Sequence, residues 1–143
     1  MNKILFSSSN DCWETPIYLN DEFGFTIDAM ANSNNKLCDR YYSIENSFLD
    51  NYPENEVIYC NPPYSRNLGK IIKHCNDLRK LNNTIVLLIP ARTDTKWFHE
   101  YLYNKDGVEL RFLKGRLKFT LNKINYNSAT FPSMIVVMKP IKN

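Results

Sequence analysis

Two consecutive prolines follow a short hydrophobic run in residues 57–65, VIYCNPPYS. Pro62 and Pro63 remove two backbone donors and fix φ at about −65°, so the chain cannot continue here as a central strand or as a helix. The segment must form a stiff turn, and the carbonyl groups of Asn61 and Pro62 have no neighbouring strand to bond. The turn therefore presents rigid hydrogen-bond acceptors to a partner outside the sheet.

An amino group on an aromatic ring is a partner that suits this turn. Its nitrogen is a poor nucleophile because the lone pair is delocalised into the ring. The Asn61 side-chain oxygen and the Pro62 carbonyl, held near the two N–H hydrogens, would draw the nitrogen toward a tetrahedral geometry and free the lone pair. Tyr64 offers a face on which a base can stack, an interaction worth about 1–3 kcal/mol. This arrangement favours transfer from a strong electrophile to an amine, without a metal or a general base.

The elements that must position the turn alternate between strands and helices. EVIYC (56–60) and NTIVLLIP (83–90) read as strands, and the second is apolar throughout, as strands buried on both faces are. Between them, apolar residues recur at the spacing of three and four that predicts an amphipathic helix: Leu68, Ile71, Ile72, Cys75, Leu78 and Leu81. The alternation predicts an α/β fold with a mostly parallel sheet and helices on both faces.

The rest of the chain gives weaker patterns. We expect a loop leading to a short helix from Pro16, a strand at 23–28 (FGFTID), a second at 40–44 (RYYSI), and another at 107–113 (GVELRFL). A helix begins near Lys96, with a Thr or Asp cap. GRLKF (115–119) and SMIVVMK (133–139) are interpreted as a closing pair of strands.

Three of the expected strands run into polar loops, in FTID-AMA, VIYC-NPPY and VLLI-PARTD. In a parallel sheet these loops share one edge, because each lies at the carboxyl end of its strand. Ligands bind at that edge in open α/β folds. The sequence therefore predicts a binding site built from all three loops.

Six blocks in order, DCWETP, FTIDAMA, YCNPPYS, PARTDTKWFH, KGRLKF and ATFPS, resemble the phage-borne Dam-like DNA N6-adenine methyltransferase family. They extend from residue 11 to about residue 137. NPPY alone is less specific, since methyltransferases of cytosine N4, RNA and protein glutamine also contain it. The resemblance implies S-adenosyl-L-methionine (AdoMet) as cofactor and a compact Rossmann-like class I methyltransferase fold, reduced in its first helix region. It also implies one methyltransferase domain over residues 1–143, without a separate target-recognition domain.

The resemblance assigns roles to individual residues. The catalytic residues would be Asn61, Pro62, Pro63 and Tyr64. The cofactor-binding residues would be Trp13, Thr15, Pro16, Asp28, Ala29 and Ala31. The substrate-binding residues would be Arg66, Arg92, Arg116 and Lys118. The family's glycine-rich F-x-G-x-G loop is missing, and the small side chains of Ala29 and Ala31 would have to permit close approach of the cofactor instead.

Plainer interpretations stay open for several of these residues. Asp28 could be an acid that closes a strand, and Trp13 could be packing. Asp94 could cap the helix near Lys96 while Arg92 reaches a phosphate or a base. The basic residues could be an ordinary charged surface.

Composition limits the function classes further. The chain has 143 residues, 43% hydrophobic, with a net charge of +3, which predicts one globular domain and permits a polyanion such as double-stranded DNA. The four cysteines form no C-x-x-C pair, and with the two histidines they fit no zinc spacing, so we expect reduced thiols and no metal. There is no apolar run of 18 residues, and we expect no membrane partner.

By resemblance the protein would act in the cytoplasm of a bacterial host, as a phage or prophage protein, and a homodimer stays open. A second hypothesis is an inactive methyltransferase-like module that binds nucleic acid, because only 33 positions separate Asp28 from Asn61. The usual first helix and second strand are compressed into that interval.

Overall fold

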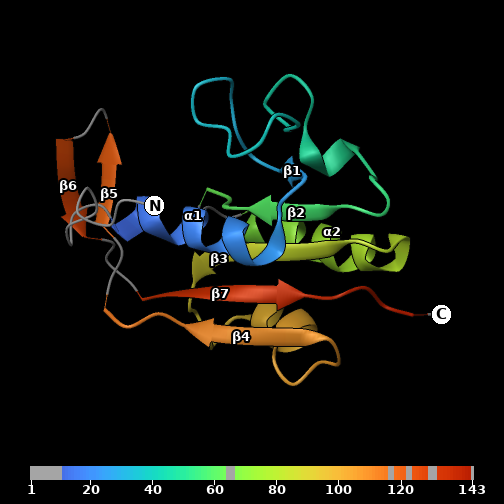
Figure 1. The fold of residues 1–143 in the computed structure, drawn as a ribbon. Helices are drawn as coiled ribbons and strands as arrows, with labels where there is room; N and C mark the ends of the chain where they lie inside the picture. The colour runs from blue at the N-terminus through green and yellow to red at the C-terminus, as the bar shows by residue number, and fades with distance from the viewer. Residues whose placement is uncertain (1–10, 64–66, 116–117, 122–123, 129–131, 143) are drawn as a thin grey trace.

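A five-stranded mixed sheet forms the centre of the protein (Figure 1). The computed structural model describes residues 11–63, 67–115, 118–121, 124–128 and 132–142, with side chains described in 17–63, 67–115 and 132–142. The strand order is β1-β2-β3-β7-β4. The strands are β1 (Ile27–Asp28), β2 (Val57–Cys60), β3 (Thr84–Pro90), β7 (Ser133–Met138) and β4 (Val108–Phe112).

The pairings explain why the sheet is mixed. β1 pairs with β2, and β2 with β3, in parallel, whereas β7 runs antiparallel to both β3 and β4. Four strands therefore point in one direction and β7 points in the other. The α/β class predicted from the sequence is confirmed, but half of the strand pairings are antiparallel.

Helices cover both faces of the sheet (Figure 1). Helix α1 (Asp11–Phe23) lies on one face, and α2 (Leu68–Leu78), extended by the 3₁₀ turn η4 (Arg79–Leu81), lies on the other. The π-helical turn η5 (Phe98–Leu102) packs on the same side as α2, and the 3₁₀ turn η3 (Phe48–Asp50) follows the long loop after β1.

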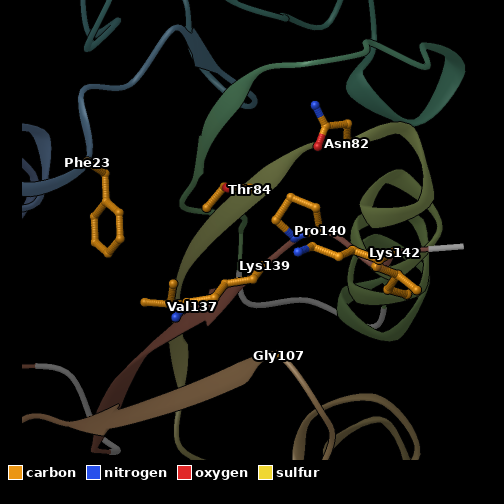
Figure 2. Close-up of a pocket in the computed structure, with 9 residues that line it drawn as sticks. Phe23, Asn82, Thr84, Gly107, Val137, Lys139, Pro140 and Lys142 are labelled. Carbon is orange, nitrogen blue, oxygen red and sulfur yellow. The ribbon is translucent and has the colours of Figure 1, made fainter.

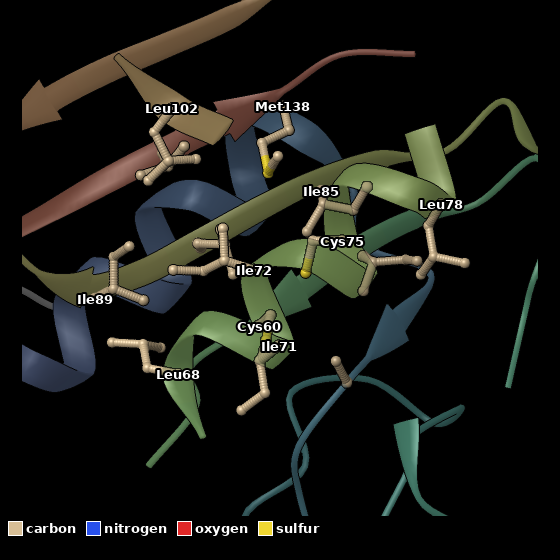
Figure 3. Close-up of a cluster of buried hydrophobic side chains, with 14 of the residues drawn as sticks. Cys60, Leu68, Ile71, Ile72, Cys75, Leu78, Ile85, Ile89, Leu102 and Met138 are labelled. Atoms are coloured by element: carbon tan, nitrogen blue, oxygen red, sulfur yellow. The ribbon is translucent and has the colours of Figure 1, made fainter. Parts of the chain in front are cut away.

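Alternate residues of β3 supply both cores. Ile85, Leu87 and Ile89 pack in the cluster beneath α2, while Val86 and Leu88 pack in the cluster that contains Leu19 of α1. Figure 3 shows the first cluster, in which Ile72 and Cys75 of α2 lie against the sheet residues. β3 is buried from its second residue onward, as its continuous apolar sequence predicted.

Several predicted elements are confirmed at nearly their predicted bounds: β2, α2 with η4, β3 and β4. The predicted Thr cap is confirmed as well. The Thr95 hydroxyl accepts a hydrogen bond from the Phe98 amide at 3.3 Å, so the capping role falls on Thr95, the neighbour of Asp94.

The N-terminal third differs from the prediction. Helix α1 begins at Asp11, five residues before Pro16. It ends where Gly24, with φ of 67°, donates its amide to the Asn20 carbonyl at 2.8 Å. Because Phe25 also donates to the Asn20 side chain at 2.8 Å, the predicted strand 23–28 shortens to Ile27–Asp28. The predicted strand 40–44 is reduced to a single bridge between Tyr41 and Asp28.

The predicted closing pair is wrong. β5 (Lys118–Leu121) pairs with β6 (Ile124–Ser128) in a separate two-stranded sheet, and β7 pairs with β3 and β4. β7 is wholly buried, so its apolar residues gain more by entering the centre of the main sheet than by forming an edge pair.

Candidate active site

Three loops meet at the carboxyl edge of the parallel strands. The register pairs Asp28 of β1 with Tyr59 of β2, and Cys60 with Leu87 of β3. The segments that follow β1, β2 and β3 therefore leave the sheet from the same edge. This confirms that the three polar loops share one edge, but the pocket described below is lined by residues that follow β1 and β2 and, within the described part of the chain, by none of the loop after β3.

The Asp28 carboxylate organises the loop after β1. The side chain is only 4% exposed, and its two oxygens accept hydrogen bonds from the amides of Leu37 at 2.9 Å and Met30 at 3.4 Å. Burial raises the pKa of Asp28, and the two amide hydrogen bonds oppose that rise. Asp28 thus folds residues 29–37 back against the end of the strand.

A pocket of about 320 Å³ lies between this loop and the turn after β2. Residues of the two predicted motifs line it together: Ala29 and Ala31 from the loop, and Pro63 from the turn. The side chains of Ala29 and Ala31 are small, so a bound molecule can approach the backbone. The pocket has a volume within the range of small-molecule sites.

The remaining lining residues were not predicted from the sequence. They are Met30, Asn32, Asn35, Tyr42, Ser43, Ile44, Ser47 and Phe48. The polar stretch ANSNN after Asp28 and the aromatic pair in RYYS were visible in the sequence, but they read as turn material and as a strand. Together these residues give the pocket amide and hydroxyl groups beside an aromatic wall.

His74 of α2 supports that wall from behind. Its Nε2 donates to the carbonyl of Asn51 at 2.9 Å, at the end of the turn η3. Its ring packs edge-on against Phe48, with centroids 4.8 Å apart, and against Tyr52 at 5.0 Å. Because Phe48 lines the pocket, its contact with His74 packs the pocket wall against α2.

The Asn-Pro-Pro turn leaves the sheet directly after β2. Asn61 and Pro63 are exposed, and Pro62 is buried. The Asn61 side chain is therefore accessible at the edge where the pocket opens. Tyr64, predicted as the stacking face, lies outside the described residues.

The other predicted residues divide into two groups. Trp13, Thr15 and Pro16 lie in α1, and Lys118 begins β5, but their side chains are outside the described part of the chain. Arg66 and Arg116 lie outside the described residues altogether. Arg92 is exposed in the loop after β3, where its carbonyl accepts the Thr95 hydroxyl at 2.8 Å.

Cys38, in the loop after β1, and Cys60, at the end of β2, have thiols with raised pKa values. Burial, with the charge of Asp28 as the next cause, raises the pKa of Cys38 to about 11. A hydrogen bond with Cys75, together with burial, raises the pKa of Cys60 well above its ordinary value. These thiols are poor nucleophiles.

A larger hollow of about 630 Å³ lies at the opposite edge of the sheet (Figure 2). It is lined by residues that include Thr84 at the start of β3 and Lys139 after β7, far along both strands from the Asn61 turn. The smaller pocket is the candidate active site because residues of two predicted motifs line it.

Two further findings concern metals and membranes. Within the described ranges, no three histidine, cysteine, aspartate or glutamate side chains come together as a candidate metal site. Among the same residues, every helix is too short or too polar to span a bilayer.

Comparison with known proteins identifies the family of the chain. The family model described as DNA N-6-adenine-methyltransferase (Dam) matches residues 3–143. A DNA N-6-adenine-methyltransferase of Escherichia phage T1 is 36% identical over 100 residues, which cover 66% of this chain and 42% of that protein. A protein of the same name from Haemophilus phage HP1 (strain HP1c1) is 25% identical over 141 residues, covering 93% of this chain and 81% of that protein.

The chain thus spans about two fifths of the length of the phage T1 relative and about four fifths of the phage HP1 relative. The family match runs through the loop after β1, the Asn-Pro-Pro turn and the loop after β3. The resemblance predicted from the sequence is confirmed: the chain belongs to the DNA N-6-adenine-methyltransferase (Dam) family.

Proposed function

We propose that the protein is an AdoMet-dependent methyltransferase that transfers a methyl group to the exocyclic N6 of adenine in DNA. The observation that carries this proposal is the shared pocket of Ala29, Ala31 and Pro63. In it, the predicted cofactor loop and the predicted amine-binding turn border the same space. A donor and an acceptor bound on either side of Pro63 would lie next to each other.

The lining residues fit AdoMet. Backbone approach at Ala29 and Ala31 suits its extended shape, and the hydroxyl and amide side chains of Ser43, Ser47 and Asn32 suit its ribose and methionine parts. Tyr42 offers an aromatic surface to a cationic sulfonium or to the adenine ring. When bound there, AdoMet supplies an electrophilic methyl group. This fit supports a compact Rossmann-like class I methyltransferase fold, in which the reduced strand at Tyr41 borders the cofactor.

The turn after β2 prepares the acceptor. The Asn61 side-chain oxygen and the Pro62 carbonyl would accept hydrogen bonds from the two N–H groups of adenine, and Tyr64 is the residue that the sequence predicts to stack on the ring. AdoMet would supply its methyl group to N6, with the bonding pair of the carbon–sulfur bond left on sulfur and the surplus N6 proton released to solvent. Rate enhancement comes mainly from orientation and proximity.

The target base must leave the helix before it reacts. An amino group inside a duplex cannot reach a donor in line, so the adenine would be flipped out of the helix toward the turn after β2. Arg92, exposed on the same edge, is placed to contact a phosphate. Both curated relatives carry names that specify adenine N6, which favours adenine over cytosine N4, RNA or protein glutamine. The reaction would take place on DNA inside a bacterial host.

A labelling experiment tests the proposal. Purified protein is incubated with methyl-labelled AdoMet and duplex DNA, and the digested nucleosides are analysed by mass spectrometry. We expect N6-methyladenine, and we expect Asn61→Ala to abolish labelling while thermal unfolding and AdoMet binding stay unchanged. Asn34→Ala, which replaces an exposed asparagine outside the pocket lining, is the matched control.

The outcomes separate the hypotheses. Label in N4-methylcytosine would change the proposed acceptor and leave the proposed site unchanged. The same holds if RNA or a protein glutamine is labelled when it is supplied in place of the duplex. A lack of AdoMet binding by calorimetry at millimolar concentration would favour the inactive module that binds nucleic acid.

A further inference from the structure

The connection between β4 and β7 is longer than the sheet requires. The two strands are antiparallel neighbours, with Phe112 opposite Met134. Such neighbours are usually joined by about two to five residues. Here the connection takes all of residues 113–132, between the end of β4 and the start of β7. The connection therefore has room for structure that pairing β4 with β7 does not need.

The connection forms a two-stranded ribbon of its own. β5 and β6 pair antiparallel, with Lys118 opposite Ser128 and Leu121 opposite Ile124, and the ribbon does not join the main sheet. Figure 1 shows it projecting beyond one end of the sheet, beside the beginning of α1. An isolated hairpin is marginally stable in water, so the neighbouring helix supports it.

The ribbon leaves from the edge that holds the candidate active site. Ser133, the first residue of β7, pairs with Pro90, the last residue of β3. β3 ends at the same edge as β2, whose next residue is Asn61. The ribbon and the Asn-Pro-Pro turn therefore extend from the same side of the protein.

The ribbon segment accounts for the net positive charge of the chain. Residues 113–132 contain four basic residues, Lys114, Arg116, Lys118 and Lys123, and no aspartate or glutamate. The net charge of the whole chain is +3, so the remaining residues together carry a net charge of −1. Lys114 is exposed. The segment is thus the part of the chain best suited to a polyanion.

We propose that the β5–β6 ribbon is the DNA-reading element of this protein and that it enters the major groove next to the target adenine. The major groove admits a two-stranded β-ribbon, and asparagine side chains can bond adenine bidentately at N6 and N7. The ribbon segment contains three asparagines, at positions 122, 125 and 127. The choice of duplex DNA as partner rests on the proposed function, and the ribbon would give this domain a sequence preference of its own.

Charge variants test the phosphate contacts. The double variant Lys114→Gln/Lys118→Gln removes two charges from the ribbon segment, and Lys80→Gln/Lys142→Gln removes two from the opposite edge of the sheet. Binding to a fluorescent duplex is measured at several salt concentrations, without AdoMet. We expect the first variant to lower the slope of log K against log salt by about two and the control to leave it unchanged. Equal slopes in the two variants would overturn the proposal.

Replacement of the ribbon tests recognition. In one variant a Gly-Gly link replaces residues 116–128, and in another Asn125→Ala changes a single candidate reader. We expect the link variant to keep AdoMet binding by calorimetry and to lose duplex affinity at least tenfold. We expect Asn125→Ala to change which adenines are methylated.

The readouts keep this inference separate from the proposed function. Loss of duplex binding in the ribbon variants supports the inference even if the wild-type protein methylates no adenine. A folded link variant that binds the duplex with wild-type affinity overturns it. If the link variant fails to fold, the salt slopes of the two charge variants decide the question.

Discussion

Replacement of Asp28 by alanine tests whether its carboxylate holds the loop after β1 in place. The carboxylate accepts the amides of Leu37 at 2.9 Å and Met30 at 3.4 Å, and a hydrogen bond to a charged group contributes about 1.5–3 kcal/mol. The longer bond contributes less, and removing a buried carboxylate recovers part of the cost of its desolvation. We therefore expect Asp28→Ala to lower the free energy of unfolding by about 2 kcal/mol.

This destabilisation has two measurable consequences. For a domain of this size, about 2 kcal/mol corresponds to a fall in the melting temperature of roughly 6–8 °C. Because Ala29, Met30, Ala31, Asn32 and Asn35 of this loop line the pocket, a loop that must be re-ordered on binding should weaken AdoMet binding by about 30-fold, the equivalent of 2 kcal/mol. Urea unfolding and calorimetric titration with AdoMet measure the two effects.

Two variants serve as comparisons. Asp28→Asn keeps one acceptor oxygen for the Leu37 amide and should lose about half as much stability. Asp39→Ala removes a fully exposed acid from the same loop and should change stability by about 0.5 kcal/mol or less. If Asp28→Ala were as stable as Asp39→Ala, the carboxylate would not hold the loop. Loss of stability with wild-type AdoMet affinity would show that the loop does not form the cofactor site.

Three more predictions concern buried polar groups. Burial raises the pKa of Asp28 above its ordinary value of 3.8, so the part of its stability that is linked to the protonated form is full below pH 3.8 and is lost as the pH rises through the folded-state pKa, while the bonds from the Leu37 and Met30 amides remain; urea unfolding at stepped pH should show Asp28→Asn gaining on the wild type across that window. His74→Ala loses the bond to Asn51 and the ring contacts, and it should cost about 2 kcal/mol and weaken AdoMet in calorimetry, whereas unchanged affinity would remove His74 from the support of the pocket. Arg79→Met leaves the carbonyls of Lys139 and Asp106 without their guanidinium donors, so thermal unfolding should show a loss of about 3 kcal/mol with AdoMet affinity intact, and a loss below 1 kcal/mol would contradict it.

The chemistry of the site was predictable because it depends on local backbone rules. Two prolines after a β-branched run dictate a turn at Asn61 in any context, and parallel strands dictate that the turn shares an edge with the loops after Asp28 and Pro90. The structure confirms this edge and places Ala29 and Ala31 beside Pro63. The identity of each contact to cofactor and DNA stays a prediction.

The pocket wall was not predictable because it depends on contacts distant in the chain. Phe48 lines the pocket and packs against His74, which lies 26 positions later in the chain. The sequence around either residue does not indicate the other as its partner. β1 was predicted too long because the residues after Gly24 serve to end α1. The partner of β5 was assigned wrongly, since β5 and β7 both have strand-forming sequences and only packing decides which strands pair.

The reversed strand β7 determines the order in which the protein can be assembled. β4 has β7 as its hydrogen-bonded neighbour in the sheet, although β7 is made later than every other strand. During synthesis, β1, β2 and β3 can associate as they emerge. β4 has no strand to pair with until β5, β6 and then β7 have been made. A pause in translation after residue 132 would therefore leave a half-built sheet, with one side of β3 open to chaperones and to other chains.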